Sequence, residues 1–423
     1  LLTLTLLGII FAAPITKIIA WGFSSDTYKL TATIELTRIL FPYLLFACLA
    51  ALMLGVLNSM KVFFLPAVAP ALLSVSEIIY VTLFIFVFTL NEDVQIKGLA
   101  LSVLAGGFGQ YVLQQIAVIK NGMPLRFSTD FRHPGLKNIF YLMLPSMIGF
   151  SVDQVNSFVD TICASFISEG SITALYYSNR LMQLPLALFG IATATVSLPH
   201  MAESIVQNNL SEMKNTLNFS IRMVIFSLVP ATVGLAMLAE PIVRVLFERG
   251  SFDKTATAFT SSALIFYCWG LVAFSTTKII AAAFYSMKNT KIPVRTAVIS
   301  MLVNVILNVI LMKPMGVGGL ALATTISSWL NTTILLVSLR NKIGLLGIRK
   351  IINSSIKILI STGVMAAGVH FTHITLSVYN ETISVFMSII IGIFLYFFAS
   401  RHLKSEELKP IISMLRRESP SDE

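Results

Sequence analysis

Two distant parts of this chain repeat each other at one constant spacing. Residues 12–15 read Ala-Ala-Pro-Ile and residues 239–242 read Ala-Glu-Pro-Ile, while the triplet Ser-Met-Lys occurs at 59–61 and again at 286–288. Both pairs lie 227 residues apart (241 minus 14, and 286 minus 59). A spacing held across two separate helix–loop junctions predicts two homologous halves, an architecture that is common among membrane transporters.

The composition indicates that these halves lie in a membrane. Apolar residues make up 56% of the 423 residues, charged residues only 12%, and the mean hydropathy is +0.84. A soluble protein of this length could not keep so much apolar surface from water. The apolar runs are long and rich in Leu, Ile, Phe and Ala. We therefore expect an all-α polytopic membrane protein, not a barrel of short alternating strands.

Twelve spans are expected from the apolar runs, and the loops between them differ in charge. Loops on one side, with the C-terminal tail, hold 18 Lys and Arg residues, against 6 on the other. The positive-inside rule places the first side and the C-terminus in the cytoplasm. Much of the net charge of +10 therefore serves to orient the chain in the membrane, and we do not expect nucleic acid as a partner. The expected spans cover about 1–20, 37–57, 66–90, 94–118, 138–167, 172–204, 216–238, 257–286, 293–312, 317–339, 351–373 and 379–400.

The repeat also divides the chain into parts. Six spans lie between Pro14 and Pro241, so the halves share one orientation and are related by an axis along the membrane normal. The repeat partners of the spans at 138–167 and 172–204 would lie 227 residues earlier, before Leu1. We therefore expect the first half to lack two helices; a half that evolved without them is the alternative. The expected parts are a truncated N-terminal lobe of four helices (1–119), a basic cytoplasmic connector (120–137), a C-terminal lobe of six helices (138–340), two extra helices (341–400) and a cytoplasmic tail (401–423).

An arginine inside an apolar span is the first candidate for function. Arg180 follows Tyr-Tyr-Ser-Asn at 176–179 within the span at 172–204. An ionisable side chain at this depth costs several kcal/mol on insertion scales, so it marks function by default. The guanidinium presents a fixed fork of donors that suits a phosphate. The alternative is a structural arginine that reaches the helix end or pairs with a carboxylate.

Polar stripes on three helices form the second candidate. Asp153, Asn156 and Asp160 share one helix face, because positions seven apart project within about 20° of each other. Asn304 and Asn308 lie one turn apart on another helix, and the next helix adds the hydroxyl of Thr324. Carboxylate, amide and hydroxyl oxygens suit a hard cation such as sodium. Hydrogen bonding between helices explains the same residues equally well.

Two further charges interrupt apolar spans. Glu77 is the repeat mate of Asn304 (304 minus 227), so the same helical position is polar in both halves; it either faces a cavity between the lobes or packs inside its own lobe. Lys278 lies in the middle of a span, where it either reaches the cavity or pairs with a carboxylate. We find no phosphate-binding loop and no nucleophile–base motif. We therefore expect no enzymatic activity and no required cofactor.

Five segments together carry a resemblance to a known family. They are Phe-Pro-Tyr at 41–43, Leu-Tyr-Tyr-Ser-Asn-Arg-Leu-Met at 175–182, Leu-Phe-Glu-Arg-Gly-Ser-Phe at 246–252, Phe-Tyr-Ser at 284–286 and Gly-Leu-Ala-Leu-Ala-Thr at 319–324. The chain resembles the MurJ (MviN) lipid II flippases of the multidrug/oligosaccharidyl-lipid/polysaccharide exporter superfamily over essentially its whole length. The resemblance implies two six-helix lobes and two extra helices, about 14 helices in a complete protein and 12 in this chain.

The resemblance also implies a function. It implies translocation of lipid II, an undecaprenyl-pyrophosphate-linked peptidoglycan precursor, from the inner to the outer leaflet of the bacterial inner membrane by alternating access. An ion gradient or the membrane potential would drive the step, and cell-wall synthesis proteins are possible partners. The two extra helices would hold the lipid tail. The drug or ion antiporters and the O-antigen or polysaccharide-lipid exporters of the same superfamily are the alternative; a membrane scaffold that transports nothing is a third hypothesis.

The resemblance assigns roles to individual residues. Arg180 matches the family's cavity arginine, and with it we expect Asn179, Thr173, Glu77 and Lys278 to contact the substrate. Asn179 stands where some members have an acid, which makes this cavity more positive. The sodium site of some members implies an ion site here, with Asn308 replacing an acid and weakening it. The expected ligands of Na+ as the coupling ion are Asp160, Asn304, Asn308, Thr324 and the backbone carbonyl of Leu320.

Overall fold

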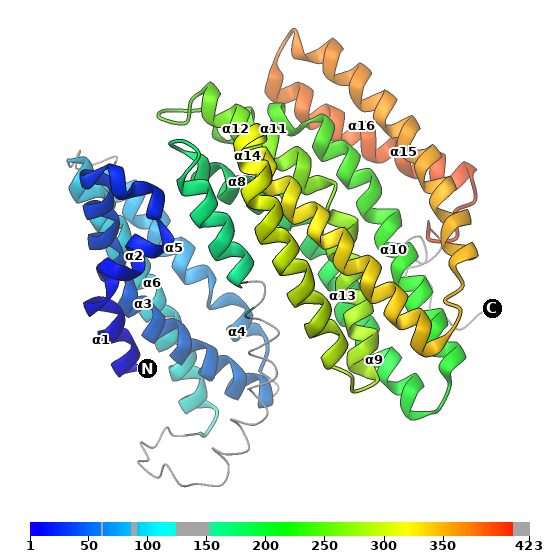
Figure 1. Cartoon of the computed structure of the whole chain (residues 1–423), viewed down its shortest axis with the longest axis horizontal. Coiled ribbons are helices and arrows are strands. Elements are labelled where there is room, and N and C mark those ends of the chain that lie inside the picture. The colour runs from blue at the N-terminus through cyan, green and yellow to red at the C-terminus, as the bar shows by residue number, and fades with distance from the viewer. Residues whose placement is uncertain (61, 86–90, 124–150, 152–153, 409–423) are drawn as a thin grey trace. The chain divides into compact units, whose positions relative to one another are not determined.

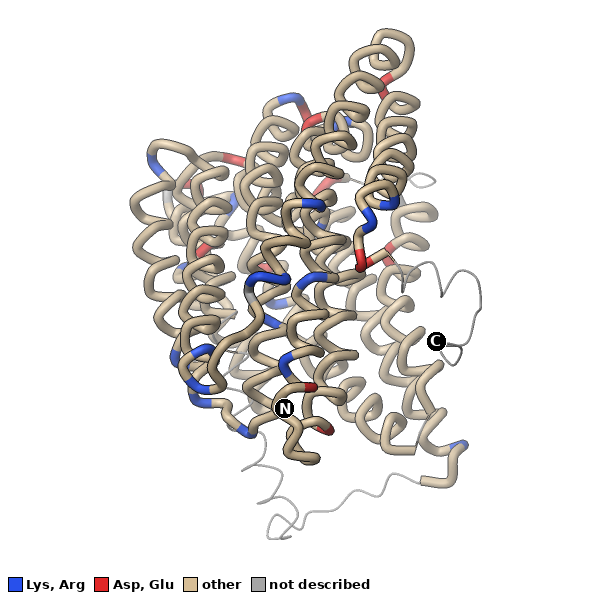
Figure 2. The backbone as a smooth tube through the Cα atoms, turned by 90° about the vertical axis from the view of Figure 1, so that its right-hand side faces the viewer, with Lys and Arg blue, Asp and Glu red and all other residues tan. Residues whose placement is uncertain are grey.

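The computed structural model describes residues 1–60, 62–85, 91–123, 151 and 154–408, and every regular element in these ranges is a helix. Figure 2 shows long stretches of helix without any Lys, Arg, Asp or Glu residue, as expected for a chain in a bilayer. The chain divides into two compact units, Leu1–Asn138 and Ile139–Glu423. Each unit is described by itself.

The first unit is built on two long helices that pack against each other, α3 (Thr27–Ser59) and α6 (Glu92–Lys120). Glycines on α6 allow the close approach: a Cβ at Gly106 would overlap Ser76, and one at Gly107 would overlap Tyr43. Small residues at helix contacts are the usual basis of association in membranes. The other elements are α1 (Leu2–Ile10), α2 (Ala12–Ile19), η1 (Trp21–Ser25), α4 (Phe64–Val68), α5 (Ala71–Tyr80) and the π-helical η2 (Val81–Ile85).

The second unit contains the helix over residues 154–165 and ten further elements (Figure 1). Asparagine and aspartate caps begin several of them: Asp253 accepts from the Ala256 N–H at 2.9 Å and Asn380 from the Ile383 N–H at 3.1 Å. The elements are α8 (Ser171–Pro185), the π-helical η3 (Leu186–Ile191), α9 (Ala192–Val206), α10 (Leu210–Met237), α11 (Ala239–Phe247), α12 (Lys254–Cys268), α13 (Leu271–Ser286), α14 (Lys291–Ile343), α15 (Ile348–Ser377) and α16 (Glu381–His402).

Eight of the described helices are long and apolar enough to cross a membrane, or up to ten if each of two bent pairs forms one span. The span expected at 1–20 is one such pair, because α1 and α2 meet at 70°. The long α14 contains two expected spans, 293–312 and 317–339, joined at Gly316 with φ 56° and ψ −132°. Much of the span expected at 138–167 lies outside the described residues, so twelve spans stay a prediction.

Hydroxyl groups join the helices at the core of the second unit. Thr325 on α14 donates to the Phe266 carbonyl at 2.8 Å, Thr332 donates to the Ala273 carbonyl at 3.0 Å, and Thr232 on α10 donates to the Cys268 carbonyl at 3.1 Å. Lipid tails are as apolar as the side chains of the core, so packing and bonds of this kind hold helices together in a membrane. The largest fully buried side chains among these helices include Leu264, Leu271, Ile279, Ile280, Phe284 and Leu320.

The last two helices are attached to this core at the middle of α16. α15 and α16 pack on each other, and α15 packs on α10. The Tyr396 hydroxyl of α16 donates to the Phe226 carbonyl of α10 at 2.6 Å, within a buried cluster that includes Met365 and Val369. The rings of Phe226 and Tyr396 also contact each other, tilted by 51° with centroids 5.2 Å apart.

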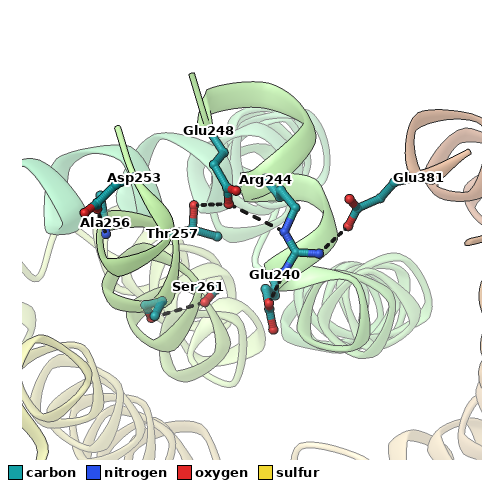
Figure 3. Close-up of polar contacts among 9 residues, drawn as sticks. Glu240, Arg244, Glu248, Asp253, Ala256, Thr257, Ser261 and Glu381 are labelled. Carbon is teal, nitrogen blue, oxygen red and sulfur yellow. Dashed lines mark hydrogen bonds and ion pairs between the residues drawn. The ribbon is translucent and has the colours of Figure 1, made fainter. Parts of the chain in front are cut away.

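An arginine network attaches the beginning of α16 to α11 (Figure 3). Arg244 donates from Nη1 to Glu381 Oε1 at 2.7 Å, and its Nε lies 3.5 Å from Glu248 Oε2. Arg244 also pairs with Glu240, one turn earlier on the same helix. Glu248 in turn accepts a hydrogen bond from the Thr257 hydroxyl on α12 at 2.8 Å. One guanidinium thus links three elements at this end of the helix pair.

A second arginine attaches the residues that follow α16. Arg222 on α10 donates to Glu406 Oε2 at 2.6 Å and lies 3.3 Å from Glu407 Oε1. The hydrogen bond from Arg222 holds the pKa of Glu406 below its usual range. Glu407 is only 2% exposed and also accepts from the Ser354 hydroxyl of α15 at 2.8 Å. The two glutamates share one arginine but differ in burial, since Glu406 is 68% exposed.

This difference in burial yields a stability prediction. Arg222→Ala leaves the buried Glu407 carboxylate without its cation, and breaking a buried pair this way costs about 3–5 kcal/mol. Glu406→Gln removes an exposed pair and should cost at most about 1 kcal/mol. Thermal unfolding of the purified full-length protein should therefore show a much larger drop in Tm for Arg222→Ala. Adding Glu407→Gln to Arg222→Ala should recover part of the loss. Equal Tm values for Arg222→Ala and Glu406→Gln would contradict this account.

Candidate functional site

A polar cavity of about 560 Å³ lies inside the second unit. Its lining comes from the helix over 154–165 and from α8, α12, α13 and α14, and it contains both charged and amide side chains. A cavity of this chemistry among apolar helices is unusual, because polar residues inside a membrane are expensive unless they serve a function. The lining includes Asn156, Asp160, Asn179, Lys278, Asn304 and Thr324.

At one side of this cavity the expected ion ligands form a connected network. Asn308 donates from Nδ2 to Asp160 Oδ1 at 2.6 Å and lies 3.0 Å from Asn304 Oδ1. Asn304 donates to the Thr324 hydroxyl at 3.2 Å. That hydroxyl lies 3.1 Å from the Leu320 carbonyl oxygen and 3.4 Å from Asp160 Oδ2, with one proton to share. The structure thus brings together all five expected ion-site residues.

The turn at Gly316 is what makes this network possible. Asn304 and Asn308 lie on α14 before the turn, and Leu320 and Thr324 lie after it. Figure 1 shows the chain reversing direction within α14, which places the two polar turns of helix beside each other. A φ of 56° combined with a ψ of −132° lies outside the left-handed helical region and is readily adopted only by glycine, so a glycine is needed at this position. Local backbone chemistry therefore positions the site.

The network has more acceptor oxygens than donors. Within the described part of the chain, Asn308 Oδ1 and Asn156 Oδ1 are buried and have no hydrogen-bond partner. The hydrogen bonds of Asp160 come from neutral groups only. An unpartnered carboxylate charge beside orphaned amide oxygens fits a hard cation, which prefers oxygen ligands. The described residues contain no group of three or more His, Cys, Asp and Glu side chains that would favour a transition metal.

The expected substrate residues are not all in this cavity. Asn179 and Lys278 line it, and Asn179 accepts a hydrogen bond from Gln183 Nε2 at 2.6 Å. Arg180 and Thr173, on other faces of α8, are exposed and do not contribute to its lining. The Arg180 guanidinium lies over the Tyr176 ring, 5.9 Å from its centroid. The structure therefore separates the candidate residues of α8 into two groups.

The repeat mates Glu77 and Asn304 differ in their surroundings. Glu77 lies on α5 of the first unit and is half-buried, with no hydrogen bond or ion pair to another described residue. Asn304 is 1% exposed and belongs to the network. Asp153, the first member of the expected stripe, lies outside the described residues.

Several cavity residues could have been found in the sequence but were not. Ser300 lies one turn before Asn304, and Asn331 lies two turns after Thr324, so each extends a stripe that had been recognised. Gln183, three residues after Arg180, and Thr277, directly before Lys278, also line the cavity. Helical spacing indicates Ser300 and Asn331, whereas Gln183 and Thr277 reach the cavity because of how α8 and α13 pack.

Comparison with solved structures identifies the class of protein. The fold matches a multidrug resistance MATE family transporter of the MOP superfamily in an inward-facing conformation, with a TM-score of 0.66 at 17% identity over 81% of this chain and 80% of that one. A lipid II flippase MurJ in an inward closed conformation matches with a TM-score of 0.79 at 27% identity, over 95% of this chain and 80% of that one. The chain is a multi-span membrane protein with the fold of these transporters.

Sequence comparison identifies the family. The model of the family described as "Lipid II flippase MurJ" matches residues 1–394, and the chain belongs to this family. A probable lipid II flippase MurJ of Vibrio cholerae is 37% identical over 338 residues, which are 78% of this chain and 64% of the relative. A Bdellovibrio bacteriovorus relative of the same description is 30% identical over 98% of this chain and 79% of the relative. The chain spans 60% of a Rhizobium meliloti relative and 66% of one from Buchnera aphidicola.

Proposed function

We propose that this chain translocates lipid II from the inner to the outer leaflet of the bacterial inner membrane, as a transporter and not an enzyme. The observation that carries the proposal is the match of the family model to residues 1–394. This range includes every described helix except the end of α16. The charge difference between alternate loops supports a cytoplasmic C-terminus. Proteins of cell-wall synthesis would supply and consume such a substrate.

In this proposal Arg180 receives the pyrophosphate of the substrate. Its guanidinium is exposed and has no ion pair among the described residues, so its donors are free for a ligand. Arginine binds phosphate in a bidentate manner, and the ring of Tyr176 supports the cation by a cation–π contact. Thr173 is exposed on the same helix two turns earlier and would donate to the same headgroup.

We expect Arg180→Ala to reduce translocation strongly. Loss of a charge-assisted contact to phosphate removes about 1.5–3 kcal/mol of binding, which is ten- to a hundredfold in affinity. The measurement is lipid II translocation in cells depleted of their own flippase that express the full-length protein. Arg180→Lys should keep partial activity, because a point charge replaces the fork. The matched control is Arg340→Ala, an exposed arginine outside the cavity. Normal translocation by Arg180→Ala would refute the assignment.

We further propose that the network around Asp160 binds Na+ as the coupling ion. The ligands would be Asp160, Asn304, Asn308, Thr324 and the Leu320 carbonyl. The orphaned Asn308 Oδ1 supports this assignment, because a cation would satisfy it. The site has a single carboxylate among these ligands, which favours weak binding and ready release. A bound ion would neutralise the charge on Asp160 inside the membrane, and release of the ion down its gradient would drive the transport cycle.

The two neighbouring threonines of α14 test the ion site. Thr324 contacts Asp160, whereas Thr325 donates to the Phe266 carbonyl. At ten times its Kd, Na+ should stabilise the folded protein by about 1.4 kcal/mol, measured as a rise in Tm over the same concentration of choline chloride. Thr324→Val should reduce this rise, and Asp160→Asn should remove it. Thr325→Val should lower Tm equally in both salts. A rise that survives Asp160→Asn would exclude this site.

A further inference from the structure

The break between α1 and α2 in the first unit occurs again between α10 and α11 in the second. Phe11 ends α1 with φ −91° and ψ 14°, and its repeat mate Leu238 (238 minus 227) ends α10 with φ −101° and ψ 15°. A proline follows three residues later in each unit, Pro14 and Pro241. α1 packs on α3 as α10 packs on α12. The two junctions therefore share a backbone as well as a sequence pattern, and their surfaces can be compared residue by residue.

In the second unit, the last two helices cover this junction. Leu238 and Ile242 are only 2% and 8% exposed, because they belong to the buried cluster between α10, α11 and the helix pair. Figure 1 shows α15 and α16 lying along α10. The buried residues that cover the junction are Ile358, Met365, Val369, Val385, Tyr396 and Leu408. Among the described residues, no buried member of this cluster comes from α8 or α9. The junction is thus a seat for a pair of helices.

The equivalent surface of the first unit is open. Phe11 and Ile15 are the repeat mates of Leu238 and Ile242, and Phe11 is 51% exposed. Both line an apolar groove of about 310 Å³. The groove is formed by Leu4, Leu7, Gly8, Phe11, Ile15 and Phe41. Leu7 aligns with Gly234, where an added Cβ would lie 3.9 Å from Cε of Met365 on α15. The groove therefore lies where the second unit holds its helix pair.

A basic residue accompanies both surfaces. Arg244 on α11 donates to Glu381 at the beginning of α16, 2.7 Å away. Its repeat mate is Lys17 (244 minus 227), which is exposed on α2. α2 contains no Asp or Glu, whereas α11 supplies Glu240 to Arg244. The described residues include no ion pair for Lys17. Its ammonium is available for a carboxylate that comes from outside the unit.

We propose that this groove docks a two-helix transmembrane hairpin of a partner membrane protein, as α15 and α16 dock on the second unit. The hairpin packs an apolar face on Phe11 and Ile15 and presents an Asp or Glu at the beginning of its second helix to Lys17. Lipid chains would cover the apolar residues, but the repeat favours a protein, because the same backbone and basic position seat helices in the second unit. The proposal does not depend on the transported substrate.

A second copy of this chain is a poorer occupant than another protein. Its own α15 and α16 are already held on its second unit by Arg244, Tyr396 and Arg222. Two copies that met groove to groove would bring Lys17 against Lys17, and like charges facing each other oppose association. Close packing of apolar and small side chains, which holds helices together in a bilayer, is open to any hairpin of matching shape. The acid opposite Lys17 then gives the contact its specificity.

Photo-crosslinking in living cells tests the proposal. The full-length protein carries benzoylphenylalanine at Phe11, or at Phe371 as the control, an exposed phenylalanine on α15 outside the groove. The linked peptides are identified by mass spectrometry. We expect a membrane protein that is captured at Phe11 and not at Phe371, through a hairpin whose second helix begins with an acid.

Charge reversal then tests the contact with Lys17. Lys17→Glu should lower the cross-linking yield by about tenfold or more, because like charges across an interface repel. Lys254→Glu, at an exposed lysine on α12, should leave the yield unchanged. Changing the partner's acid to Lys should restore the yield with Lys17→Glu. This rescue distinguishes docking from misfolding, because a change in another protein would not repair a damaged chain.

Three results would overturn the inference. The first is a probe at Phe11 that links only to lipid or to a second copy of this chain. The second is equal capture of the same protein at Phe371. The third is a yield that does not respond to Lys17→Glu. None of them bears on the proposed function, which the translocation assay tests separately.

Discussion

A polar group inside a bilayer can bond only with other protein groups, and most of the architecture of the second unit follows from this constraint. Hydroxyls of Thr325, Thr332 and Thr232 donate to carbonyls of neighbouring helices, so the bonds that satisfy them also join the helices. The network around Asp160 differs from these joints in its chemistry. It gathers a carboxylate and a buried amide oxygen that the described residues leave partly unsatisfied, as a cation site would require.

The polar network could be predicted from sequence because helices repeat regularly. Asn304 and Asn308 are one turn apart, and Thr324 follows on the next span, so their common direction follows from the helical period alone. The bends could not be predicted in this way. Prolines, not the apolar pattern, mark both breaks: Pro14 lies four residues after the end of α1, where its ring clashes with the Ile10 carbonyl, and Pro185 directly precedes the π-helical η3. The separation of Arg180 from Asn179 agrees with the helical period, since adjacent residues project about 100° apart, but the period does not say which of the two faces the cavity.

The repeat also explains why the described part of the first unit has no matching network. The spacing of 227 aligns Asn304 with Glu77 and Asn308 with Val81 (308 minus 227). After the turn of α14 the spacing becomes 221, since Gly-Leu-Ala-Leu occurs at 98–101 and again at 319–322. Thr324 then aligns with Val103 (324 minus 221). Two of the polar ligands are valines in the first unit, so duplication preserved the backbone while the chemistry diverged.

The attachment of the last two helices limits how the second unit can move. α16 is joined to α10 and α11 at its beginning by Arg244, at its middle by Tyr396 and after its end by Arg222. Contacts spread along the whole helix prevent the pair from tilting independently, because a hinge needs one end free. Any motion of α10 and α11 must therefore carry α15 and α16 with it.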